Sequence, residues 1–82
     1  METQVWNDAM EARVRRVLSA GDDCYEVLHA EKDLDLNTLH QRYLKQALLV
    51  HPDKNKHPAA EGAMKKVTRA WKTLEKQLSQ HK

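Results

Sequence analysis

Apolar residues recur every three or four positions over residues 3–19, which predicts an amphipathic helix. The apolar stripe of this helix consists of Trp6, Met10, Val14, Val17 and Leu18. Gly21 follows it and is suited to end the helix, because glycine readily adopts the left-handed conformation found at helix C-termini. We expect the stripe to pack against the domain's own core. The alternative is that it forms a docking surface for a second protein partner.

Three more helices are predicted further along the chain. Residues 22–28 form a short one, because acids at its start suit the helix dipole and Tyr25 and Leu28 share a face. A long helix follows Asp35, a suitable N-cap, and its stripe is Leu39, Tyr43, Ala47 and Val50. Another begins with Pro58 in its first turn, and its stripe is Met64, Val67, Ala70, Trp71, Leu74 and Leu78.

The helix that follows Asp35 should end abruptly at Val50 or His51, because the residue before a proline is disfavoured in the α conformation. Pro52 and Asp53 therefore lie in a loop, and two long helices joined by a short loop pack antiparallel. The predicted fold is all-α, with an imidazole and a carboxylate at the tip of a helical hairpin. Function concentrates on loops of this kind, which contribute little to a core.

Composition limits the cellular setting of the chain. The single Cys24 among 82 residues cannot form an intrachain disulfide, which favours a reducing, cytoplasmic or cytosol-facing location. No apolar run approaches the roughly 20 residues of a membrane span, so we expect a soluble segment without membrane contact. An anchor outside this sequence is left open.

Charge is distributed unevenly, although 14 bases nearly balance 12 acids. Residues 22–35 contain six acids and one lysine, whereas residues 40–76 contain nine bases and three acids. The basic half suits an acidic partner. Nucleic acid is the weaker candidate, because the aromatic residues lie on the apolar stripes. The relevant bases are Arg42, Lys45, Lys65, Lys66, Arg69, Lys72 and Lys76.

Catalysis and cofactor binding are poorly supported, and we expect a protein that is not an enzyme. Gly21 and Gly62 stand alone, so no glycine-rich loop can cradle a phosphate. Cys24 lies beside acids that oppose a thiolate, and we expect it to serve as a packing residue. His51, Asp53 and His57 are close in sequence, but zinc requires better-matched ligand spacing. We therefore expect no metal site.

Several segments together resemble the J domain, the co-chaperone module of DnaJ-type proteins. The segment His51-Pro52-Asp53-Lys54-Asn55 resembles the family's His-Pro-Asp loop, and Asp23-Cys24-Tyr25-Glu26-Val27-Leu28 resembles its helix I motif. Tyr43-Leu44-Lys45-Gln46-Ala47-Leu48 is similar to helix II, and Ala70-Trp71-Lys72-Thr73-Leu74 to helix III. The resemblance predicts an N-terminal helical extension over residues 1–21 and a J domain over residues 22–82. No counterpart of the family's helix IV is found.

The resemblance implies binding to an ATP-loaded heat-shock-70 (DnaK-type) chaperone and stimulation of its ATPase. In the family, bases on helix II meet an acidic surface of the chaperone, and the His-Pro-Asp loop (residues 51–53) triggers hydrolysis. The residues carried over are His51, Pro52, Asp53, Lys54 and Asn55 in the loop, with Arg42, Tyr43 and Lys45 on helix II.

Three positions of helix II depart from the family pattern. Leu44 and Leu49 stand where basic residues are frequent, and Gln46 replaces a leucine that is normally buried. Gln46 suggests a compensating contact, for which the N-terminal helix is a candidate. The weaker charge leaves an alternative, a J-fold interaction module that binds through the N-terminal helix or the Leu44/Leu49 surface. His29-Ala30 also replaces the family's usual glycine after helix I.

Overall fold

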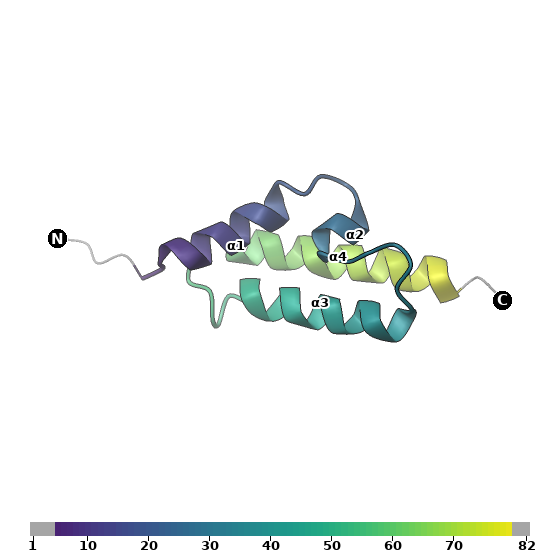
Figure 1. The fold of residues 1–82 in the computed structure, drawn as a ribbon. Helices are drawn as coiled ribbons and strands as arrows, with labels where there is room; N and C mark the ends of the chain where they lie inside the picture. The colour runs from purple at the N-terminus through teal and green to yellow at the C-terminus, as the bar shows by residue number, and fades with distance from the viewer. Residues whose placement is uncertain (1–4, 80–82) are drawn as a thin grey trace.

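The computed structural model describes residues 5–79 and contains, within that range, four helices and no strand. These are α1 (Asp8–Leu18), α2 (Cys24–Val27), α3 (Leu36–Val50) and α4 (Ala60–Ser79). Helices α3 and α4 lie side by side and run in opposite directions, with α1 and α2 along one side of the pair (Figure 1). The predicted all-α hairpin is confirmed. Along residues 5–79, none of the helices is long and apolar enough to span a bilayer.

One core joins all four helices. The predicted stripes of α3 and α4 face each other, with Leu39 and Val50 from α3 and Val67 and Leu74 from α4 almost completely buried. Val27 of α2 completes this core. Cys24 is partly buried against the same cluster, which agrees with its predicted role as a packing residue.

Helix α1 packs on this core through part of its predicted apolar stripe, whereas Leu18, also assigned to that stripe, is 44% exposed. Val14 and Val17 are fully buried. Its predicted start was wrong, because the helix begins at Asp8, where the Asn7 side chain accepts a hydrogen bond from the Met10 amide (2.9 Å) and caps it. Trp6 therefore lies before the helix. Residues 3 and 4 of the predicted helix lie outside the described range.

Helix α2 is shorter than predicted and begins at Cys24, capped by the Asp23 side chain, which accepts from the Tyr25 amide (3.0 Å). The turn that follows α2 includes His29, whose φ of 55° is left-handed. Glycine adopts this conformation at little cost, whereas a residue with a Cβ is strained there. A histidine therefore adopts the left-handed conformation in the turn where the family usually has a glycine.

The start of α3 is confirmed, because the Asp35 carboxylate accepts a hydrogen bond from the Thr38 amide (2.8 Å). Side-chain and backbone hydrogen bonds from Thr38 lower the pKa of Asp35 below its ordinary value. Asp35 therefore stabilises the orphan amides of the first turn most strongly as a carboxylate.

The start of α4 differs from the prediction that Pro58 lies in its first turn. Pro58 and Ala59 form a separate turn, and the helix begins at Ala60. The reason is His57, whose Nδ1 accepts from the Ala59 amide (3.0 Å) and whose carbonyl accepts from the Ala60 amide (3.0 Å). His57 thus satisfies backbone donors at the beginning of α4.

Candidate functional site

The loop that follows α3 is closed by backbone hydrogen bonds to His51. Its carbonyl oxygen accepts from the amides of Lys54 (2.9 Å) and Asn55 (2.7 Å). His51 itself has left the helical conformation, with ψ at 130°, as the following proline requires. Pro52 and Asp53 therefore project at the tip of a tight turn, where both are exposed.

The His51 ring is oriented by the loop backbone. Its Nδ1 accepts a hydrogen bond from the Asp53 amide (3.1 Å), which requires an unprotonated Nδ1 and places the proton of the neutral ring on Nε2. The Asp53 carboxylate Oδ2 is 3.9 Å from the same nitrogen, and its side chain is 89% exposed. Asp53 thus presents its carboxylate to solvent from a fixed main-chain position.

Asn55 holds the loop from inside. Its side chain is almost completely buried, and Nδ2 donates to the carbonyls of Leu49 (2.9 Å) and Met10 (3.0 Å). Its Oδ1 accepts from the His57 amide (3.0 Å). One side chain therefore connects the end of α3, the loop and α1. The sequence placed Asn55 at the site, but it gave no indication of this internal position.

His57 extends the connection between the loop and the N-terminal segment. Its ring meets that of Trp6 edge-on, with centroids 5.3 Å apart. Its Nε2 lies 3.8 Å from a carboxylate oxygen of Glu11. Since Nδ1 already accepts from the Ala59 amide, the neutral ring carries its proton on Nε2, facing that carboxylate. His57 therefore performs a structural task.

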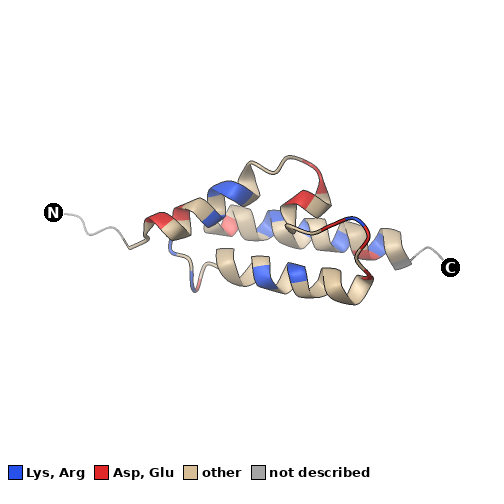
Figure 2. Ribbon diagram, viewed as in Figure 1, with Lys and Arg blue, Asp and Glu red and all other residues tan. Residues whose placement is uncertain are grey.

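The predicted basic residues of α3 lie away from the loop. Arg42 and Lys45 are exposed in the middle of the helix, which contains no acid (Figure 2). They precede His51 by nine and six residues, which corresponds to roughly 9–14 Å along the helix axis. Lys54 is exposed within the loop. The structure thus places the predicted residues along one helix and its C-terminal loop rather than in one cluster.

Tyr43 contributes more to packing than to an open surface. It is half-buried and stacks on Trp71 of α4, with ring centroids 5.5 Å apart and planes 13° from parallel. Leu44 and Leu48, by contrast, are 46% and 58% exposed on α3. The helix therefore exposes two leucines in addition to its bases.

Gln46 and Leu49, two of the departures in α3, both lie beneath α1. Gln46 is buried, and its Oε1 accepts a hydrogen bond from the Arg16 guanidinium. The same guanidinium donates to the carbonyls of Glu26 and Val27 (both 3.2 Å). Burial lowers the pKa of Arg16, an effect that Glu26 opposes. The compensating contact predicted for Gln46 is therefore confirmed.

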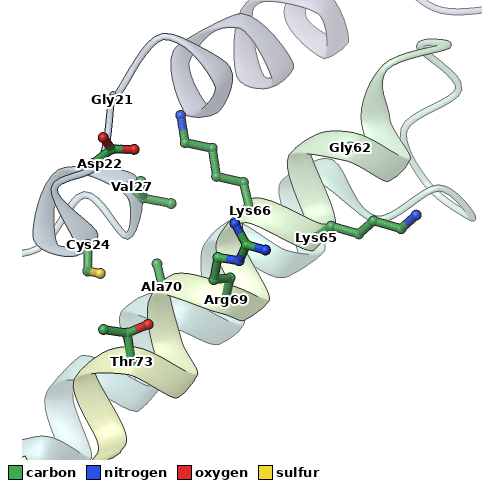
Figure 3. Close-up of a pocket in the computed structure, with 10 residues that line it drawn as sticks. All are labelled: Gly21, Asp22, Cys24, Val27, Gly62, Lys65, Lys66, Arg69, Ala70 and Thr73. Carbon is green, nitrogen blue, oxygen red and sulfur yellow. The ribbon is translucent and has the colours of Figure 1, made fainter. Parts of the chain in front are cut away.

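A cleft with a volume of about 620 Å³ lies between α2 and α4 (Figure 3). Lys65, Lys66 and Arg69 of α4 lie on one side, and Cys24 lies across from Thr73. Lys66 Nζ donates to the Leu18 carbonyl (2.9 Å), so it ties α4 to the end of α1. None of the lining residues belongs to α3 or to the loop, and this cleft is separate from the predicted site.

The side chains described in residues 5–79 do not favour a metal site or a nucleic-acid interface. That part of the chain has no group of three His, Cys, Asp or Glu residues able to hold a metal ion. Its four aromatic residues are buried or half-buried, so no exposed ring accompanies the α4 bases for stacking on nucleotides.

Comparison with known proteins decides the family. The family model of the DnaJ domain matches residues 23–81, which include α2, α3, the loop and α4. The chain belongs to the DnaJ-domain family. Helices α2, α3 and α4 of this J domain therefore correspond to helices I, II and III of the family, and α1 precedes the matched region.

Relatives of this J domain are named as chaperone proteins. It is 41% identical over 61 residues to the chaperone protein dnaJ 49 of Arabidopsis thaliana, a match that covers 74% of this chain and 17% of the relative. It is 42% identical over 52 residues to a chaperone protein DnaJ of Prochlorococcus marinus, covering 63% and 14%. The chain thus spans less than a fifth of the length of these relatives.

Proposed function

We propose that this J domain binds an ATP-loaded heat-shock-70 (DnaK-type) chaperone and accelerates its ATP hydrolysis. The domain itself performs no chemistry and acts on the active site of its partner. Its single cysteine suits a reducing, cytosol-facing compartment. The division into an extension over residues 1–21 and a J domain over residues 22–82 is part of the same proposal.

The observation that carries this proposal is the His51-Pro52-Asp53 turn. Backbone hydrogen bonds and the buried Asn55 fix its shape, while the Asp53 carboxylate remains 89% exposed. A preformed loop loses little conformational entropy on binding, and an exposed carboxylate can pair with a basic group of the chaperone. The bases Arg42, Lys45 and Lys54 would steer the encounter with an acidic surface.

Single-turnover ATP hydrolysis by a heat-shock-70 chaperone, with and without this protein, tests the proposal. We expect acceleration by the wild type and a loss of about thirtyfold or more for Asp53→Asn, since truncating one partner of a desolvated charge pair is costly. Asp33→Asn, which removes an exposed carboxylate from the α2–α3 connector, is the matched control and should stimulate normally. Equal stimulation by Asp53→Asn would exclude the trigger role.

A second function, an interaction module with weakened chaperone coupling, is favoured by the exposed Leu44 and Leu48. Exposed leucines on a docking helix add apolar contact that needs no charged partner. Leu49, which the sequence predicts on this surface together with Leu44, is less accessible because it lies half-buried beside α1. A chemical-shift titration with the chaperone distinguishes the two functions: shifts at Leu44 and Leu48 without shifts at His51–Asn55 would support the module.

A further inference from the structure

The groove between α1 and α3 has basic side chains on both walls. It has a volume of about 330 Å³ and is lined by Ala12, Arg13, Arg16, His29, Lys45, Gln46 and Leu49. No acid is among these residues. Lys45 also lines the adjoining depression on α3, together with Thr38, Gln41 and Arg42. Arg42, Lys45 and Arg13 therefore form one continuous basic surface that passes from α3 to α1.

The two arginines of this groove differ in their freedom to meet a partner. Arg16 is half-buried, and its guanidinium is engaged with two backbone carbonyls and with Gln46. Arg13 is exposed and forms no ion pair within residues 5–79, and the same holds for Lys45. Arg16 thus positions α1 on α3, while Arg13 presents an uncommitted charge beside Lys45.

One departure of α3 from its family pattern, Leu49, is explained by this arrangement. Leu49, where a base is frequent, lies half-buried in the groove beneath α1, where a cation would approach the guanidinium groups of Arg13 and Arg16. Like charges at that spacing repel each other, so a leucine suits the position. The positive charge that α3 lacks is supplied by α1.

We infer that α1 is part of the docking surface, and that Arg13 joins Arg42 and Lys45 in recognising an acidic face of the heat-shock-70 chaperone. This inference rests on the function proposed above. The charge complementarity is direct, because the charged residues that line the composite surface are all bases and an acidic partner face would neutralise them. Residues 1–21 are then a contributor to binding rather than an inert extension.

Arg15 provides a matched control for Arg13. It is on the same helix and exposed, but it pairs with Glu11 (3.1 Å) and does not line the groove. Arg13→Gln and Arg15→Gln remove the same charge and keep a good helix former. Circular dichroism should show equal helix content for both variants, so that any difference in binding reflects the position of the charge.

The experiment measures association and dissociation rates with the ATP-loaded chaperone at low and moderate salt, together with ATPase stimulation. We expect Arg13→Gln to slow association roughly three- to fivefold and to reduce its salt dependence, because rim charges act mainly on encounter. Arg15→Gln should associate like the wild type.

Three outcomes separate the inference from the proposed function. Slower association for Arg13→Gln alone supports the composite surface. Equal rates for wild type, Arg13→Gln and Arg15→Gln, with stimulation still lost in Asp53→Asn, would overturn the composite surface and leave the proposed function intact. Absence of stimulation by the wild type would overturn the proposed function and the inference with it.

Discussion

Asn55 is a buried polar residue of the loop, and both ends of its side-chain amide form hydrogen bonds. Two carbonyls from different helices accept its Nδ2 protons, and a loop amide donates to its Oδ1, so its hydrogen-bonding capacity matches its surroundings closely. A buried amide without these partners would be costly. Its position explains why a polar residue is buried at the end of a helical hairpin.

We predict that Asn55→Ala lowers the free energy of unfolding by about 2 kcal/mol, because buried backbone groups lose their partners. Asn55→Asp should be more damaging, since it places a carboxylate oxygen against two carbonyl oxygens. Urea denaturation measures both effects. Asn37→Ala, an exposed asparagine in α3, is the control and should change stability little. An Asn55→Asp variant as stable as wild type would contradict the assignment of these hydrogen bonds.

At the scale of helices, the sequence predicted most of what was found. The hydrophobic pattern placed α3 and its Asp35 cap correctly, because an acidic cap followed by a regular apolar stripe is a strong local signal. The antiparallel hairpin followed from the short loop. The sequence also placed the candidate site residues on α3 and in the loop after it, and their role stays a prediction.

Features that depend on contacts between distant residues could not be predicted from the sequence. Trp6 fits the apolar stripe of α1, yet Asn7 caps the helix after it and the Trp6 ring packs on His57. His57 satisfies amides at the start of α4 through its side chain and carbonyl, which no helix-start pattern describes. Asn55 bonds a carbonyl 45 residues away, beyond the reach of local patterns.

Because the Asp35 carboxylate caps α3, the stability of the protein should decrease in acid. Because hydrogen bonds lower the folded-state pKa of Asp35, its contribution is complete above the unfolded pKa near 3.8 and is lost as pH falls through the folded value. We expect the stability of wild type relative to Asp35→Asn to decrease between ~pH 6 and ~pH 2.5. Urea denaturation at the two pH values measures it.

Asp33→Asn controls for general loss of carboxylate charge in the same connector. Its stability relative to wild type should show a smaller change between the two pH values, because Asp33 is not among the caps of the helices described in residues 5–79. A pH dependence that is identical for Asp33→Asn and Asp35→Asn would argue against a specific contribution from the cap.

At the scale of the whole molecule, α1 is part of the packed core. Val14 and Val17 are buried in the same core as Val67 and Leu74, and Lys66 bonds the end of α1. Removal of α1 would expose that core surface as well as Gln46. The boundary of the family match at residue 23 therefore does not coincide with a boundary of the packed core.

We predict that amides of α1 around Val17 and amides of α4 around Val67 exchange with solvent through the same global unfolding. Native-state hydrogen exchange in increasing urea measures their opening free energies, which should converge to one value. The start of α1 at Asp8, which is exposed, is the internal control for fraying. Exchange of the Val17 region through an opening of much lower free energy would show that α1 detaches independently.

The hydrogen bond from Asn55 to Met10 has a consequence for sequence variation. The acceptor is a main-chain carbonyl, so the bond is indifferent to which side chain occupies position 10. A one-residue insertion between Met10 and Val14, whose side chain is buried in the core, would rotate Met10 by roughly 100° relative to that core and turn its carbonyl away from Asn55. Insertions and deletions in this part of α1 should therefore be tolerated less well than substitutions at position 10.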